Sequence, residues 1–181
     1  DVRSEVMRMF AALIGLIVGF SVSLSSLAAS YTEGKEYVVL AERIVPADPN
    51  KIEVAEFFSY ACPHCYKFEP ILQAWVKKFP ADVKLVQTHV SFNRPDWASY
   101  QRGYYTVVAL GVKDKVQDAI FNSIYVANKN LSGAQDWADF LSLYGVDKQK
   151  TLSTYNSFGV NSQIKQAEAR TRDFKIPSTP M

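Results

Sequence analysis

The spacing of apolar side chains changes along the chain and predicts where strands and helices lie. Residues 52–60 begin as an apolar and polar alternation and end as a nearly continuous apolar run, which is typical of a strand buried on both faces. Apolar residues then recur at helical spacing over 66–79, and 83–90 alternates again. A helix between two strands favours a parallel pairing, so the pattern predicts a β-α-β unit. Residues 37–40 are a further short strand candidate.

Helical spacing continues from residue 97 to residue 173. Breaks in the pattern predict five helices, at 97–111, 114–129, 134–144, 148–158 and 160–173. Gly111, Gly145 and Gly159 mark three of the breaks, and Ser132 and Asp147 are candidate N-caps. A block of helices after a β-α-β unit indicates a helical domain inserted into a sheet domain, and more strands should follow it.

The N-terminal segment has the three regions of a secretory signal. Arg8 is followed by an apolar run from Phe10, then by a serine-rich stretch that ends in small residues at Ala28. Even when it is extended to Leu24 the run is only about 15 residues long, shorter than the ~20 that a membrane-spanning helix needs. We therefore expect translation to start at Met7, cleavage to occur after residue 28, and the mature protein to be exported.

The composition is that of an ordinary globular protein. The 181 residues are 48% hydrophobic and 21% charged, which excludes disordered and fibrous classes. Twenty basic residues stand against 18 acidic ones, and this balance, with no cluster of Lys or Arg, gives no reason to expect a nucleic-acid partner. Two cysteines are too few for a disulfide scaffold, so their position matters more than their number.

Cys62 and Cys65 flank Pro63 and His64 at the junction between the first predicted strand and its helix. Pro63 falls in the first helical turn, where a missing N–H costs nothing. Unpaired N–H groups and the helix dipole favour the thiolate of Cys62, and His64 can add a donor or a positive charge. Since a stabilised thiolate is a good leaving group, a Cys62–Cys65 disulfide would be oxidising. Cys65 should be buried, with a higher pKa, and should resolve the mixed disulfide.

Other uses of the two cysteines stay open beside this one. An inert structural disulfide is possible, although a loop of two residues staples little. A zinc site would need two more ligands, for which only His64 and His89 are available, and His89 fits a structural role better. A c-type haem attachment needs histidine where Tyr66 stands. We predict no cofactor and no metal.

Several segments together resemble the DsbA family of periplasmic thiol:disulfide oxidoreductases, over about residues 36 to 180. The segments that carry the resemblance are Glu56–Tyr60 leading into Cys62–Tyr66, then Thr88–Phe92, Ala109–Val112 and Asp114–Val116. The resemblance implies an α/β, thioredoxin-like fold with an inserted all-helical domain. It also implies an enzyme that donates disulfides to newly exported proteins and is reoxidised by DsbB, a quinone-linked membrane oxidase.

The resemblance also assigns supporting roles. Glu56 corresponds to a partly buried acid that exchanges protons with Cys65, and a solvated strand residue is the alternative. The lysine that commonly pairs with this acid is replaced here by Gln87, so the charge pair is absent and Glu56 should be harder to ionise. Thr179 and Pro180 correspond to the cis-proline segment that faces the active-site disulfide, with an ordinary trans-proline turn as the alternative.

The domain organisation follows from these assignments. It comprises upstream residues and signal peptide (1–28), a first thioredoxin-like part (29–96), the inserted helical domain (97–173) and the start of a second thioredoxin-like part (174–181). A thioredoxin-type sheet needs about two more strands and a covering helix. We therefore expect the C-terminal strands and helix to be missing, the strand around Phe57 to have an unpaired edge, and residues 29–181 alone to be unstable or inactive.

The sequence thus predicts a monomeric periplasmic enzyme that passes a disulfide through Cys62 to reduced, unfolded exported proteins. An isomerase or reductase of the same fold is one alternative, although too few residues precede the first long strand to form a dimerisation domain. A non-catalytic, chaperone-like binding module is the other.

Overall fold

The computed structural model describes residues 30–46 and 48–181. The chain divides into two units, Asp1–Ala41 and Glu42–Met181, and the labelled helices and strands all lie in the second. The predicted signal peptide, residues 1–28, lies outside the described residues. None of the helices that the structure describes is both long enough and apolar enough to cross a membrane.

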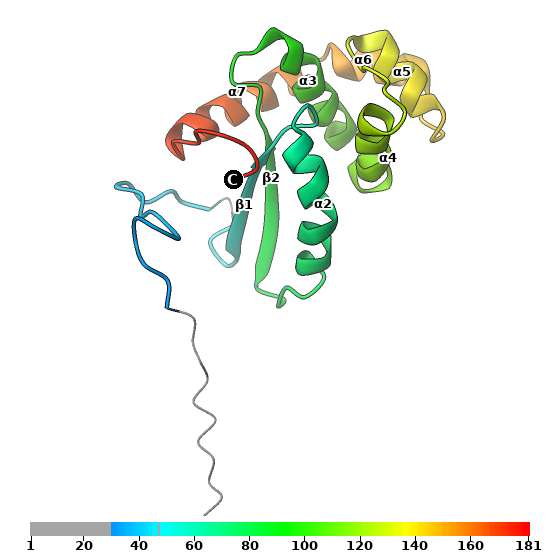
Figure 1. The fold of residues 1–181 in the computed structure, drawn as a ribbon. Coiled ribbons are helices and arrows are strands. Elements are labelled where there is room, and N and C mark those ends of the chain that lie inside the picture. Colours follow the sequence, from blue (N-terminus) through cyan, green and yellow to red (C-terminus); the bar gives the residue numbers. More distant parts are fainter. Residues whose placement is uncertain (1–29, 47) are drawn as a thin grey trace, which may run out of the picture. The chain divides into compact units, whose positions relative to one another are not determined.

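The predicted β-α-β unit is present. Strands β1 (Ile52–Phe58) and β2 (Val83–His89) are parallel, with Glu56 opposite Gln87, and helix α2 (Pro63–Val76) connects them. Figure 1 shows α2 along one side of the two strands and α7 (Phe158–Asp173) on the other. Side chains of a strand point alternately to opposite faces, so adjacent residues of β1 meet different helices. Phe57 packs on Phe174, next to α7, with ring centroids 5.0 Å apart.

The helical block follows the predicted spacing closely. It consists of α3 (Pro95–Ala109), α4 (Lys113–Tyr125), α5 (Ala134–Ser142), α6 (Lys148–Tyr155) and α7. Asp147 is the N-cap of α6, as predicted, because its side chain accepts a hydrogen bond from the Lys150 N–H at 2.7 Å. The Ser132 prediction is wrong. Gly133 is the N-cap of α5, and the Ser132 hydroxyl donates to the Asp136 carboxylate instead.

The predicted break at Gly159 is also wrong. The Ser157 hydroxyl accepts a hydrogen bond from the Val160 N–H, so α7 begins at Phe158 and includes Gly159. A side-chain cap thus outweighed the glycine as a boundary.

Residues 37–40 do not form the predicted strand. In the described residues this region contains only an isolated parallel bridge between Glu33 and Tyr37, around a turn in which Gly34 has a φ of 84°. The Gly34 N–H donates to the Tyr37 carbonyl at 2.8 Å. The Tyr37 carbonyl is therefore hydrogen-bonded within the local turn, whereas in a strand it would be available to pair with a neighbouring strand.

The last residues lie beside β1. The Phe57 N–H donates to the Met181 carbonyl at 2.9 Å, and the Met181 N–H donates to the Phe57 carbonyl at 3.1 Å. The edge of β1 that was expected to be unpaired at Phe57 is therefore paired there. The same segment contains the Thr179–Pro180 peptide bond, which is cis, as the resemblance implied.

One hydrophobic core joins the helical block to the β1–α2 junction. It contains both cysteines, Phe58 of β1 and Tyr60 of the junction, together with large side chains of the block, including Tyr104, Phe121, Trp137 and Leu141. Trp137 is fully buried and lies against the backbone of α3 at Gly103, where a Cβ atom would overlap the indole ring. Gly103 is thus required by the close approach of α5 to α3.

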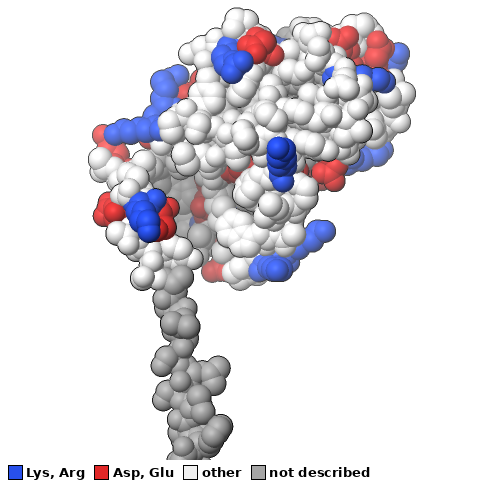
Figure 2. Space-filling view, viewed as in Figure 1, with Lys and Arg blue, Asp and Glu red and all other residues white. Residues whose placement is uncertain are grey.

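The surface carries mixed charge. On the face seen in Figure 2, Lys and Arg side chains occur in small groups next to Asp and Glu, with wide uncharged areas between them. This distribution agrees with the near-balanced composition and gives this face no continuous basic band.

We predict that Gly103→Ala destabilises the protein by about 2 kcal/mol or more, because the added methyl group overlaps Trp137 in a packed core. Gly159→Ala is the matched control. It also places alanine in a helix, but its Cβ would meet only the Ser157 hydroxyl at an ordinary 3.7 Å, and it should be neutral or stabilising by up to about 1 kcal/mol. Urea unfolding of both variants tests this, and equal stabilities would contradict the packing argument.

Candidate functional site

The two cysteines lie where β1 gives way to α2. Cys62 is the N-cap of α2 with extended backbone angles, and Pro63 is the first helical residue. Both cysteines are free thiols with little exposure, 4% for Cys62 and 1% for Cys65. Cys62 thus stands at the N-terminus of α2, where the sequence predicted it, beside the unpaired backbone N–H groups of the first turn.

The pKa of Cys62 is lower than that of an ordinary thiol. Burial is the largest single effect and raises the pKa, but four hydrogen-bond donors together outweigh it. They are the Thr179 hydroxyl, the backbone N–H groups of His64 and Cys65, and the Cys65 thiol. Each stabilises negative charge on the Cys62 sulfur, so the thiolate is favoured despite its burial.

The pKa of Cys65 moves in the opposite direction. It is raised to about 12, chiefly by burial and also by the neighbouring Cys62 sulfur, while hydrogen bonds with Ser59 and Thr179 oppose the increase. Two thiols three positions apart thus differ strongly in how readily they lose a proton. The burial of Cys65 and its higher pKa agree with the sequence prediction.

The C-terminal segment completes the surroundings of Cys62. The Cys62 thiol donates to the Thr179 carbonyl at 3.4 Å, which joins residues 117 positions apart in sequence. The structure therefore brings Thr179 and Pro180 to the cysteine pair, as predicted.

His64 and Pro63 are exposed beside the buried sulfurs. The contribution of His64 to the low pKa of Cys62 comes from its backbone N–H. The positive charge proposed for its imidazole from the sequence is therefore not needed to explain that pKa.

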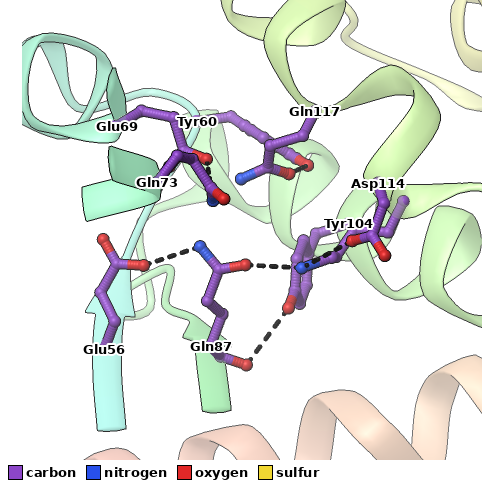
Figure 3. Close-up of polar contacts among 9 residues, drawn as sticks. Glu56, Tyr60, Glu69, Gln73, Gln87, Tyr104, Asp114 and Gln117 are labelled. Atoms are coloured by element: carbon purple, nitrogen blue, oxygen red, sulfur yellow. Dashed lines mark hydrogen bonds and ion pairs between the residues drawn. The ribbon is translucent and has the colours of Figure 1, made fainter. Parts of the chain in front are cut away.

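Glu56 lies buried in β1, with an exposed fraction of 4%. Its carboxylate accepts a hydrogen bond from the Gln87 side-chain amide at 2.7 Å, as Figure 3 shows. The pKa of Glu56 is raised to about 7, chiefly by burial and also by the charge of Glu69, while Gln87 and Lys113 act to lower it. The carboxyl is harder to ionise, as predicted, and it exchanges its proton close to neutral pH.

Two polar groups of the site were missed in the sequence. Glu69 of α2 is buried with an exposed fraction of 3%, and burial raises its pKa although Gln73 donates to it at 2.8 Å. Its position four residues after Cys65 and three before Leu72 places it on the buried helix face, so the spacing alone could have identified it. Lys113 is the second, and its contact with Gln87 depends on tertiary packing.

His89 has a structural role, as predicted. Its Nε2 accepts a hydrogen bond from the Tyr60 N–H at 2.9 Å, and complete burial lowers its pKa to about 3, so the ring is neutral. Among the described residues no three His, Cys, Asp or Glu side chains are grouped so that they could hold a metal ion.

Comparisons with known proteins agree with this arrangement. A family model described as the DSBA-like thioredoxin domain matches residues 53–181. The thiol:disulfide interchange protein DsbA of Pseudomonas aeruginosa is 40% identical over 157 residues, which are 87% of this chain and 74% of that protein. The protein of the same name from Burkholderia cepacia is 39% identical over 168 residues, 92% of this chain and 77% of the relative.

A solved structure gives the same result for the fold. The crystal structure of Pseudomonas aeruginosa DsbA superposes with a TM-score of 0.78 at 40% identity, covering 84% of this chain and 79% of that one. The α/β thioredoxin-like fold with its helical block is thus shared with proteins named for thiol:disulfide interchange. The chain belongs to the DSBA-like thioredoxin domain family and is a thiol:disulfide oxidoreductase.

Proposed function

We propose that Cys62 and Cys65 form the redox disulfide of this enzyme and that it donates this disulfide to newly exported proteins. One observation carries the proposal: the two thiols at one helix N-terminus have pKa values moved in opposite directions. A disulfide whose reduced form holds a stabilised thiolate at Cys62 gives up its bond readily, because that thiolate is a good leaving group.

The first step forms a mixed disulfide. A substrate thiolate attacks the Cys62 sulfur, a bond forms between the two, and the Cys62–Cys65 bond breaks with its electron pair left on Cys65. Because the pKa of Cys65 is about 12, this sulfur takes up a proton. Pro63 and His64 are exposed beside Cys62 and would border the incoming chain.

Glu56 is the proposed source of that proton. Its pKa of about 7 means that the carboxyl holds a proton in part of the molecules at neutral pH. Two observations support this proposal: Cys65 and Glu69 lie on one face of α2, and the charge of Glu69 acts on Glu56. Glu56 would recover the proton when the enzyme is reoxidised.

The second step releases the product. The second substrate thiolate attacks the substrate sulfur of the mixed disulfide, and Cys62 leaves as its stabilised thiolate. The substrate has then lost two electrons and gained a disulfide, while the cysteine pair has been reduced. Thr179 and Pro180 lie against Cys62 and would position the substrate backbone during both steps.

The cellular setting is proposed from the sequence and the family. The secretory signal within residues 1–28 would take the protein to the periplasm, where its substrates are reduced, unfolded exported proteins. The reduced enzyme needs an oxidant, for which we propose a DsbB-like, quinone-linked membrane protein. The enzyme would act as a monomer.

We predict that Cys62→Ala abolishes oxidative refolding of a reduced substrate, because the attacked sulfur is gone. Cys65→Ser should accumulate a mixed disulfide between Cys62 and the substrate, visible as a band that disappears on reduction. Turnover retained by Cys62→Ala would overturn the proposal and favour a chaperone-like binding role.

We also predict that the reduced protein shows one thiolate ionisation below the ~8.5 of a free cysteine, measured by the ultraviolet absorbance of the thiolate against pH. The step should be absent in Cys62→Ala. In Cys65→Ser it should remain, because most donors to Cys62 are unchanged. A step that persists without Cys62 would contradict the assignment.

Glu56→Gln should flatten the pH dependence of stability. The pKa of this carboxyl is about 7 in the folded protein against a reference of 4.5, so its favourable contribution is complete below pH 4.5 and is lost as pH rises through 7. The shift sets an upper limit of about 3 kcal/mol. Urea unfolding at pH 5 and pH 8 tests this. The free energy of unfolding of the variant, relative to that of the wild type, should be higher at pH 8 than at pH 5.

Glu42→Gln, which changes an exposed carboxyl, is the control and should leave the pH dependence as it is. If Glu56→Gln and the wild type keep parallel pH profiles, Glu56 does not titrate near neutral pH and cannot supply the proton.

A further inference from the structure

Lys113 occupies a position that helix electrostatics disfavour. It is the first residue of α4, where the positive end of the helix dipole repels a cation. Its ammonium group does not extend freely into solvent, because the side chain is only 26% exposed. It donates a hydrogen bond to the Gln87 Oε1 atom at 2.7 Å and also lies 3.2 Å from the carboxylate of the exposed Asp114. An interaction of the Lys113 charge with buried groups of the protein would explain why lysine stands at this helix N-terminus.

Gln87 connects this cation to a buried acid. Its Nε2 group donates to Glu56 at 2.7 Å, and its Oε1 atom accepts from Lys113 at 2.7 Å (Figure 3). The two partners fix the orientation of the amide, since a carboxylate only accepts and an ammonium only donates. The amide dipole therefore lies between the anion and the cation, with its negative end toward Lys113 and its positive end toward Glu56.

We propose that Lys113 is a positioning residue for Glu56, and that it brings a positive charge from the helical block to the buried carboxyl through the Gln87 amide. The proposal deepens the proposed role of Glu56 as a proton carrier and rests on it. Lys113 touches no reacting sulfur, so it acts only through Gln87.

The other groups around Glu56 show why a cation matters there. From α2, Glu69 adds a second buried carboxyl, whose charge disfavours ionisation of Glu56. From α3, the Tyr104 hydroxyl donates to the Gln87 carbonyl at 3.2 Å, and burial keeps that phenol neutral by raising its pKa. From the start of α4, Asp114 adds a third, solvent-exposed acid. Among the described side chains that shift the pKa of Glu56, Lys113 is the only one with a positive charge.

The size of the effect can be bounded. Two hydrogen bonds and one amide separate the two charges by roughly 7 Å, which at an effective dielectric of about 20 corresponds to a pKa shift between about one and two units. Because Lys113 is partly exposed, solvent screens its charge and reduces the shift in the pKa of Glu56. We therefore expect a shift of about one pKa unit.

The test is a carbon-13 NMR titration of the Glu56 carboxyl in the full chain. Lys113→Met should raise the pKa of Glu56 by about one unit, a tenfold change in its protonation equilibrium. Lys115→Met is the matched control, because it removes the same charge from α4 while its ammonium bonds the Tyr144 carbonyl. It should leave the pKa within a few tenths of a unit.

Lys113→Arg keeps the positive charge and should keep the titration near that of the wild type, which separates charge from shape. Circular dichroism checks that each variant folds, and if Lys113→Met does not, Lys113→Gln takes its place. An unchanged pKa in the charge-removing variant, or an equal shift in Lys115→Met, would overturn the proposal. The outcome is independent of the cysteine assignment, since Cys62→Ala tests turnover and this titration reports only on Glu56.

Discussion

Burial of the Cys62–Cys65 turn between α2 and the helical block is the constraint on which the site depends. Burial alone raises the pKa of a thiol, and for Cys65 it dominates. Cys62 has the opposite pKa shift because it is the N-cap, where backbone N–H groups converge and where Thr179 can reach it. The chemical difference between the two sulfurs is therefore a difference in donors, set by which one begins the helix.

Burial also governs two carboxyl groups, Glu56 of β1 and Glu69 of α2. Glu56 and Glu69 would each prefer water, yet both are nearly inaccessible, and amide side chains rather than cations contact them directly. Neutral donors satisfy the oxygens without forcing ionisation, so a pKa close to 7 is a natural result for Glu56. A lysine in direct contact would have held the carboxyl ionised, and Gln87 weakens that effect by placing the cation one amide away.

The sequence predicted the parts of this site that depend on local order. The strand-to-helix junction and the opposite characters of Cys62 and Cys65 follow from apolar spacing and helix geometry. Thr179 was placed there only by family resemblance, because no local pattern links positions 117 residues apart. The wrong N-cap prediction at Ser132 depends on the direction of one hydrogen bond. The Ser132 hydroxyl donates to Asp136, whereas the side chain of an N-cap must accept a hydrogen bond from the helix backbone. Lys113 could not be foreseen, because its contact with Gln87 depends on the tertiary structure, which brings the start of α4 to this side chain of β2.

The helical block contributes to the redox site as well as covering it. Three of its side chains bond the last residues of β2: Tyr104 donates to the Gln87 carbonyl, Gln101 to the His89 carbonyl, and Lys113 to the Gln87 side chain. Buried backbone carbonyls need such partners, and a solvent-facing strand end would have found them in water. Bringing the block onto β2 thus removes water from the carboxyl region and replaces it with fixed donors. The protonation state of Glu56 thus depends on its burial and on side chains from β2, α2 and α4.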